Sequence, residues 1–282
     1  MILKKIKQAL KDPKILTEYL NFIIHSGNPK IYLYNQVYIT NFTDFSEYHS
    51  FINLISFSEI SFLKQISLQE GVVIDVGGNL GAFSLLFAEF YKKSVYSFEP
   101  NPSTYSSLVK NISLNGKRQS IEAICMALSD KVGELSFYSN PKSRATARLN
   151  LNPSSNPSDN EVKTVKCTTL DQYLEDKKLD KIAFLKVDVE GYEELVFQGA
   201  INSLKQHKVD VIYYEVCPYQ ANTVNLNPKT PSQILLDNSY KLYKLNHNGK
   251  LLPADINDIS TLRYENWVAL SSKVSMSQDM FA

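Results

Sequence analysis

A glycine-rich loop next to an acid is the first feature of the sequence that could do chemistry. The stretch VVIDVGGNLGAFS spans residues 72–84, and after its apolar run come Asp75, Gly77, Gly78, Asn79 and Gly81. Glycines at the end of a strand accept positive φ and let the backbone approach a ligand closely. Their order misses the G-x-G-x-x-G spacing of dinucleotide sites, and no Lys-Ser/Thr pair follows, as a P-loop requires.

A second acid, Glu99, ends the next apolar run, VYSFE. A carboxylate there can accept hydrogen bonds from the ribose hydroxyls of a nucleoside. A ribose site without a pyrophosphate cradle favours a nucleoside that carries no diphosphate, and S-adenosyl-L-methionine fits that description. Asp75 would then orient the ammonium of its amino-acid tail, directly or through water. The alternative is a glycine-rich turn that only packs a helix on a strand.

Three further acids lie near the ends of two later apolar runs. Lys186, Asp188 and Glu190 alternate in FLKVDVEGYE, so a strand would point all three to one side. Asp188 or Glu190 is a candidate general base for a hydroxyl acceptor. The alternative pairs Asp188 with Lys186 and lets Glu190 cap the following helix. Glu215, in YYEVCP, is a third candidate catalytic acid at the same edge, and without a ligand-spacing motif no metal site is predicted.

Alternating strands and helices are needed to position these residues. Strands are expected over residues 72–76, 95–99, 121–128, 182–189 and 209–216, with two late strands in KLYKL and WVALSS. Helices are expected over residues 82–91, 102–114 and 192–206. Strands joined by helices predict an α/β fold with a doubly wound, mostly parallel sheet covered on both faces. Ligands of such sheets bind beyond the carboxyl ends of the strands.

Two parts of the chain do not follow this alternation. Residues 1–70 show apolar side chains at helical spacing and are expected to form a mostly helical N-terminal extension of a domain over residues 71–282. Residues 139–161 are polar and rich in Pro, Ser and Asn, which predicts a long loop. That loop is either a lid that recognises the substrate or plain surface disorder.

The composition favours a cytoplasmic enzyme over a nucleic-acid or membrane protein. A formal net charge of +1 provides no basic face for nucleic acid. No apolar run approaches the roughly 20 residues that span a bilayer, and no signal-peptide pattern is found. Residues 1–20 form a basic amphipathic stretch that could weakly touch an anionic membrane, although docking on the protein itself is favoured. The three cysteines lack metal-ligand spacing, which is typical of reduced thiols.

Several separated motifs resemble the FkbM-like family of class I methyltransferases. They are DVGGNLG (75–81), SFEPNP (97–102, with Pro100), ALSD (127–130), TTLDQYL (168–174) and FLKVDVEGYE (184–193). The resemblance implies a Rossmann-like methyltransferase fold, S-adenosylmethionine as methyl donor, and O-methylation of a saccharide, glycan or glycosylated metabolite. It also implies that Ala127 and Leu128, after the third strand, border the adenine.

Three other functions are weighed against this one. An NAD-dependent oxidoreductase could use the same topology, but the missing G-x-G-x-x-G motif disfavours it. A non-catalytic scaffold with a methyltransferase fold has no physical need for the combination of Asp75, Gly77, Gly81 and Glu99. RNA methylation lacks support because the chain is nearly neutral and shows no basic or aromatic stripe.

Overall fold

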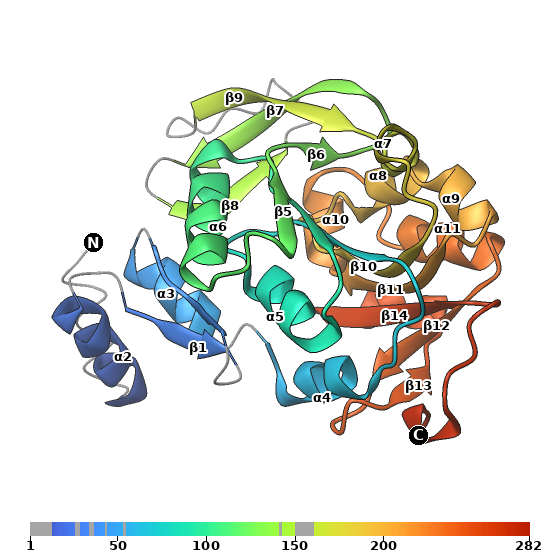
Figure 1. The fold of residues 1–282 in the computed structure, drawn as a ribbon, viewed down its shortest axis with the longest axis horizontal. Coiled ribbons are helices and arrows are strands. Elements are labelled where there is room, and N and C mark those ends of the chain that lie inside the picture. The colour runs from blue at the N-terminus through green and yellow to red at the C-terminus, as the bar shows by residue number, and fades with distance from the viewer. Residues whose placement is uncertain are drawn as a thin grey trace.

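The computed structural model describes residues 13–25, 29–33, 37–42, 44–52, 55–140, 143–149 and 161–282, and Figure 1 shows how they are arranged. The basic amphipathic residues at positions 2–11 lie outside the described residues. The N-terminal elements are α2 (Pro13–Ile24), β1 (Ile31–Leu33), β2 (Val37–Ile39), α3 (Phe45–Ile52) and α4 (Phe57–Gln65). β1 and β2 form an antiparallel hairpin. The start of α4 is fixed by a capping box, in which Ser56 and Glu59 each bind the other's backbone N–H.

The central sheet has eight strands in the order β13-β12-β14-β11-β10-β3-β4-β5. Their bounds are β3 (Val72–Val76), β4 (Val95–Phe98), β5 (Ile121–Ile124), β10 (Ile182–Val187), β11 (Val209–Val216), β12 (Tyr240–Leu245), β13 (Leu251–Pro253) and β14 (Glu265–Ser271). The five strands from β5 to β11 are parallel, whereas β14 runs antiparallel between β11 and β12. The expected doubly wound, mostly parallel sheet is confirmed, and its order reverses direction between β3 and β10.

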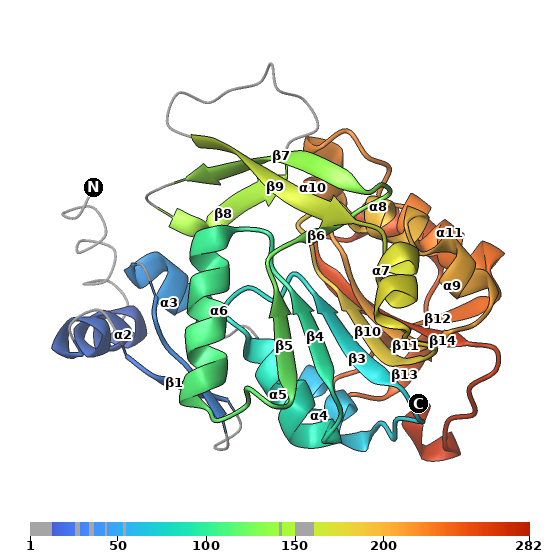
Figure 2. The ribbon, with the colours of Figure 1, turned by 45° about the horizontal axis from the view of Figure 1, so that its top comes forward.

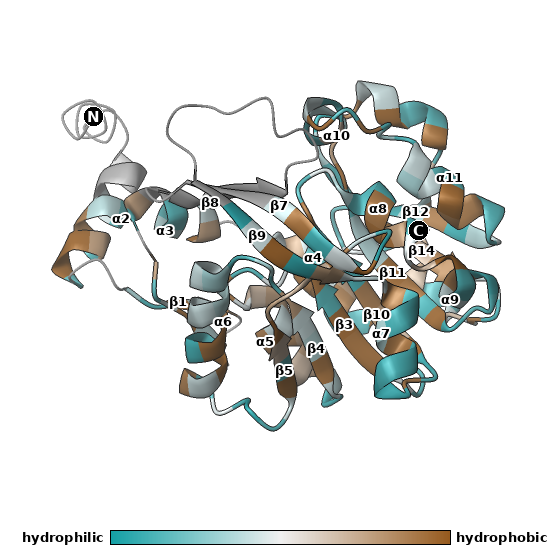
Figure 3. Ribbon diagram, turned by 90° about the horizontal axis from the view of Figure 1, so that it is seen from above, coloured by the Kyte–Doolittle hydropathy of each residue, from teal (hydrophilic) through white to brown (hydrophobic). Residues whose placement is uncertain are grey.

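Helices cover both faces of this sheet, as expected. They are α5 (Ala82–Tyr91), α6 (Pro102–Leu114), α7 (Leu170–Lys177), α8 (Glu193–Gln198), α9 (Ile201–Lys205), α10 (Pro218–Thr223) and α11 (Thr230–Asp237), with short 3₁₀ turns η1 (Ile256–Thr261) and η2 (Gln278–Met280). One core cluster joins α4, α5 and α6 to one face of the sheet. The other joins α7, α8, α9 and α11 to the opposite face. In Figure 3 the strands between these layers are largely hydrophobic, since both of their faces are buried.

A second, four-stranded sheet replaces part of the loop expected over residues 139–161. Its order is β6-β9-β7-β8, with bounds β6 (Ala127–Leu128), β7 (Gly133–Asn140), β8 (Ser143–Leu149) and β9 (Glu161–Thr168). Figure 2 shows it across the end of the central sheet. The loop prediction is therefore wrong for residues 143–149, which pair with β7 although they lack apolar alternation. Residues 150–160 lie outside the described residues.

Three other element boundaries differ from the expected ones. The third strand breaks at Cys125 and Met126, so that β5 and β6 belong to different sheets. The helix expected over residues 192–206 is split at Gly199, where an added Cβ would lie 2.0 Å from the carbonyl oxygen of Ser129. β10 ends at Val187, two residues early, so the strand alternation does not extend to Glu190.

Asn111 of α6 and Asn115, which follows the end of that helix, attach the N-terminal hairpin to the domain. Asn111 is fully buried; its Nδ2 donates to the carbonyls of Thr40 (3.1 Å) and Leu80 (2.9 Å), and its Oδ1 accepts from the Thr40 N–H (3.2 Å). One turn later, Asn115 makes two bonds to the backbone of Tyr38. Because Leu80 belongs to the glycine loop, Asn111 joins the N-terminal extension to that loop.

We expect Asn111→Ala to lower the free energy of unfolding by about 1–3 kcal/mol, because it leaves buried backbone groups without partners. Urea unfolding of the full chain measures this loss. The matched control is Asn202→Ala on α9, where the asparagine is exposed. Equal effects of the two substitutions would contradict the bridging role of Asn111.

Candidate functional site

A row of polar residues crosses four neighbouring strands of the central sheet. Strand register places Ser97 beside Asp75, Asp75 beside Lys186, and Lys186 beside Tyr213. All four residues are buried. Directly opposed residues share a face, and this is the face that α4 and α5 cover. A buried polar row on an otherwise apolar face needs internal partners, because unpaired buried charges are costly.

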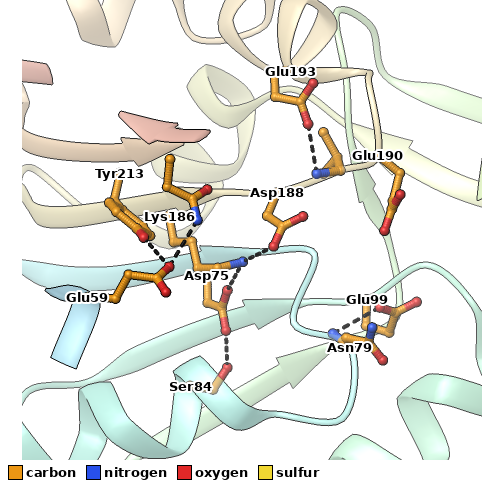
Figure 4. A network of polar contacts seen from close by, with 12 residues as sticks. Glu59, Asp75, Asn79, Ser84, Glu99, Lys186, Asp188, Glu190, Glu193 and Tyr213 are labelled. Carbon is orange, nitrogen blue, oxygen red and sulfur yellow. Dashed lines mark hydrogen bonds and ion pairs between the residues drawn. The ribbon is translucent and has the colours of Figure 1, made fainter. Parts of the chain in front are cut away.

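Lys186 is the cation at the centre of this row, as Figure 4 shows. Its Nζ lies 3.0 Å from Asp188 Oδ2 and 3.7 Å from Asp75 Oδ1, and it also sits 4.7 Å from the centre of the Phe83 ring. Burial opposes its charge, but Asp188 and Asp75 outweigh burial and raise the pKa of Lys186. The pairing of Lys186 with Asp188, one of the alternatives considered from the sequence, is thus observed.

Asp75 lies in the interior, behind the glycine loop. Its Oδ2 accepts a hydrogen bond from Ser84 Oγ at 2.5 Å, and the same hydroxyl lies 2.7 Å from Ser97 Oγ. Burial raises the pKa of Asp75 against the opposing effect of Lys186. Because Ser84 is in the first turn of α5, these contacts fix the start of that helix on β3 and β4.

The glycines of the loop are required by its packing on the neighbouring strands. Gly77 has φ +85°, and an added Cβ would lie 1.9 Å from the carbonyl oxygen of Asp188. A Cβ on Gly78 would lie 2.1 Å from Ser97 Oγ. Gly81 has φ +93° at the cap of α5, a region that favours glycine. The loop therefore rests directly on the turn that carries Asp188, while Asn79 is exposed.

Glu99 anchors the outer part of the same loop. Its Oε2 accepts from the backbone N–H of Asn79 (3.1 Å), and its Oε1 accepts from that of Asn101 (2.8 Å). Asn101 caps α6 through its Oδ1, whereas its buried Nδ2 has no hydrogen-bond partner among the described residues. Asn101 was not singled out from the sequence, although its place in SFEPNP, directly before a helix-opening proline, was a signal for a cap.

The residues expected to border the adenine differ in burial and lie on different elements. Pro100 is half-buried, and its carbonyl lies 3.9 Å from Cys125 Sγ. Ala127 and Leu128 are buried in β6, where they pair with Cys167 and Thr168 of β9. Their side chains pack into two different core clusters. Contact between these two residues and an adenine ring stays a prediction.

The turn after β10 holds the two acids predicted as base candidates. Asp188 keeps a third of its side chain exposed. Glu190 is exposed, has φ +58°, and accepts a hydrogen bond from Gln220 of α10. Glu193 accepts from the backbone N–H groups of Val189 (3.0 Å) and Gly191 (3.3 Å), which precede α8, and capping of that helix by Glu190 stays a prediction. Burial raises the pKa of Glu193 to about 7.

Glu215 lies at the end of β11, close to the same turn. Its side chain is buried, and its Oε2 has no hydrogen-bond partner among the described residues. Burial, and then the nearby Asp188, Glu193 and Glu190, raise the pKa of Glu215 to about 10. A carboxyl group with this pKa carries a proton at neutral pH, so it can donate one hydrogen bond as well as accept others.

Neither a metal centre nor a membrane span emerges from the described residues. No group of three or more His, Cys, Asp or Glu side chains in that part of the chain is placed to hold a metal ion. None of its helices is both long and apolar enough to cross a bilayer.

The sequence comparisons agree with this geometry. The family model described as "Methyltransferase FkbM domain" matches residues 75–242. The chain is 27% identical over 192 residues to the "Hexuronic acid methyltransferase AglP" of Haloferax volcanii, a match over 67% of this chain and 72% of that protein. It is 28% identical over 153 residues to "Methyltransferase sdnD" of Sordaria araneosa, over 45% of this chain and 59% of that one.

A solved structure supports the fold. The methyltransferase FkbM from Methylobacillus flagellatus superposes with a TM-score of 0.50 at 14% identity, over 76% of this chain and 48% of that one. The chain thus spans about half of that protein. The residues that the family model matches make up more than half of the whole sequence, and they include the glycine loop, Glu99, Asp188 and Glu215. The chain belongs to the FkbM family of methyltransferases.

Proposed function

We propose that the protein transfers a methyl group from S-adenosylmethionine to a hydroxyl group of a saccharide, a glycan or a glycosylated metabolite. One observation carries the proposal beyond the family. Two buried polar atoms at the carboxyl ends of β4 and β11, namely Asn101 Nδ2 and Glu215 Oε2, have no hydrogen-bond partner among the described residues. Buried polar groups are normally satisfied, so ligands are their natural partners here. AglP, by its name, acts on a sugar acid.

The residues at the ends of β3 and β4 fit this cofactor. A carboxylate offers about four acceptor sites, so the two backbone bonds of Glu99 are compatible with ribose hydroxyls as further donors. The loop from Gly77 to Gly81 and the Asn101 amide would line the same side, and Asp75 would favour the cationic tail. Pro100, Ala127 and Leu128 remain the proposed adenine side. S-adenosylmethionine supplies an electrophilic methyl group on its sulfonium.

Asp188 is the proposed proton acceptor for the hydroxyl. Its side chain is partly exposed, and Lys186 holds one of its oxygens at 3.0 Å, which restricts its rotation. The backbone carbonyl of Asp188 also lies against Gly77, so the turn that carries Asp188 packs directly on the cofactor loop. A base held in this way is aligned before the acceptor arrives. Glu190, which is exposed in the same turn, would align the acceptor.

The charge of the site supports a hydroxyl acceptor over a carboxylate. Asp188 and Glu190 lie together at this end of the sheet, and each contributes to raising the pKa of Glu215. The negative charge of a carboxylate acceptor would be repelled by these acids. A neutral hydroxyl avoids that repulsion, and the protonated Glu215 can donate a hydrogen bond to a neighbouring sugar oxygen. A hydroxyl also needs the base that Asp188 offers, whereas a carboxylate needs none.

The proposal is tested with the full chain, labelled S-adenosylmethionine and a panel of neutral and acidic saccharides. We expect label on at least one saccharide, in a form that resists mild alkali, because a methyl ether survives conditions that hydrolyse a methyl ester. Label that alkali releases would place the methyl group on a carboxylate. Binding of S-adenosylhomocysteine without any transfer would exclude the whole saccharide panel as acceptors.

We expect Asp188→Asn to lower kcat by about 10²–10⁴-fold, the usual contribution of a positioned general base. The affinity for S-adenosylhomocysteine should stay within about threefold, because asparagine keeps the size of the side chain. Single-turnover kinetics and calorimetry measure the two quantities. Glu190→Gln is the matched comparison and should cost less. If both variants keep full activity, neither acid is the base.

We expect Glu215→Gln to stabilise the protein increasingly as pH rises. The pKa of about 10 in the folded protein lies above the ordinary glutamate pKa of 4.5, so the folded state keeps a proton that the unfolded chain releases. Wild-type stability therefore falls between these pH values, by at most about 1.4 kcal/mol per pH unit from this group. Urea unfolding at acid, neutral and alkaline pH measures the difference. The exposed Glu134→Gln is the control, and parallel wild-type and Glu215→Gln profiles would contradict the prediction.

A further inference from the structure

A chain of hydrogen bonds runs from the N-terminal extension into the site. Glu59 of α4 accepts from the Tyr213 hydroxyl and, at 2.9 Å, from Asn266 Nδ2. Asn266 Nδ2 also donates to the Tyr264 hydroxyl at 3.0 Å. Strand register places Asn266 directly beside Glu215. Because the capping box holds the Glu59 carboxylate, this chain fixes where the Tyr264 hydroxyl lies.

Tyr264 combines an exposed ring with a hydroxyl that faces buried acids. The residue is 53% exposed. Burial of the hydroxyl end, followed by the charges of Asp188, Glu215 and Glu59, raises the pKa of Tyr264. The hydroxyl accepts from Asn266, and among the bonds between described residues its own proton has no acceptor. Tyr264 thus presents a hydrogen-bond donor and an aromatic face next to the candidate base.

Two exposed tyrosines lie on neighbouring segments near this end of the sheet. Tyr32, Phe57, Tyr219 and Tyr264 are all exposed. Phe57 lies on the first turn of α4, two residues before Glu59. Tyr219 lies on α10, next to the Gln220 that donates to Glu190. Cys217, just before α10, lies 3.6 Å from the carbonyl of Arg263, so the Tyr219 and Tyr264 segments are neighbours. Tyr32 lies in the N-terminal hairpin.

We propose that Tyr264 positions the acceptor, with its ring stacked on one face of a pyranose and its hydroxyl bonded to a sugar oxygen, while Glu59 and Asn266 hold that hydroxyl in place. This inference rests on the proposed function and narrows its acceptor to a sugar ring. A pyranose offers C–H groups on its face and hydroxyls at its edge. The tyrosine ring can pack against the C–H groups, and the neighbouring acids can bond to the hydroxyls. Tyrosine also supplies a rigid contact surface at low entropic cost. The N-terminal extension thereby becomes part of the acceptor site.

The experiment uses saturation-transfer NMR on the full chain with S-adenosylhomocysteine present. The probes are the methyl glycosides of glucose, galactose, mannose and glucuronic acid. We expect at least one glycoside to bind through the protons of one ring face. Tyr264→Ala should weaken that binding by about tenfold, through loss of the ring contact. Tyr264→Phe and Asn266→Ala should weaken it by about threefold to tenfold, through loss of one hydrogen bond.

Two controls separate a local effect from a failure of the fold or of the proposed function. Tyr32→Ala removes an equally exposed ring outside the site and should leave glycoside binding unchanged. All variants should bind S-adenosylhomocysteine with wild-type affinity, and for a glycoside that is methylated, Tyr264→Phe should raise KM more than it lowers kcat.

The possible outcomes distinguish a failure of the methyltransferase proposal from a failure of the sugar-ring inference. Wild-type protein that does not bind S-adenosylhomocysteine overturns the proposed function and this inference with it. Wild-type protein that binds S-adenosylhomocysteine but none of the glycosides overturns the sugar-ring inference alone. Equal glycoside binding by wild type and Tyr264→Ala also overturns it, while the methyltransferase proposal stands.

Discussion

Lys186 carries a positive charge in the interior of an apolar sheet face, and the placement of the surrounding elements depends on it. A buried cation without a partner costs several kcal/mol, so carboxylates must reach it. Asp75 reaches it from β3 and Asp188 from the turn beyond β10. These strands flank the point where the sheet order reverses. One side chain therefore holds the strand that leads into the glycine loop next to the turn that carries the candidate base.

This single cation leaves the surrounding acids without full compensation. Burial and mutual repulsion favour the neutral forms of the most enclosed acids, so the pKa of Glu193 rises to about 7 and that of Glu215 to about 10. Asp188 remains partly exposed beside Lys186. The same end of the sheet can thus offer a carboxylate that accepts a proton and a carboxylic acid that donates a hydrogen bond, which is what alignment of a neutral hydroxyl acceptor requires.

Features with local causes could be predicted from the sequence, and features with distant causes could not. β3, α5 and the proline that opens α6 follow from apolar runs and cap signals within a few residues. Glu59 meets Tyr213 across 154 positions, and Asn111 meets Thr40 across 71. No periodicity encodes such pairs, because the packing of helices against strands and loops far away in the chain decides them. β8 was missed for a related reason, since its polar residues are ordered by pairing with β7.

The most direct test of the account is calorimetric titration of S-adenosylhomocysteine into the wild-type protein and into Glu99→Ala. The account predicts binding by the wild type and at least about tenfold weaker binding by the variant, since a carboxylate hydrogen bond contributes about 1.5–3 kcal/mol. Urea unfolding should show that both proteins remain folded. A folded wild-type protein that binds no S-adenosylhomocysteine, or equal affinity in the two proteins, would contradict the assignment of the glycine loop and Glu99 to the cofactor.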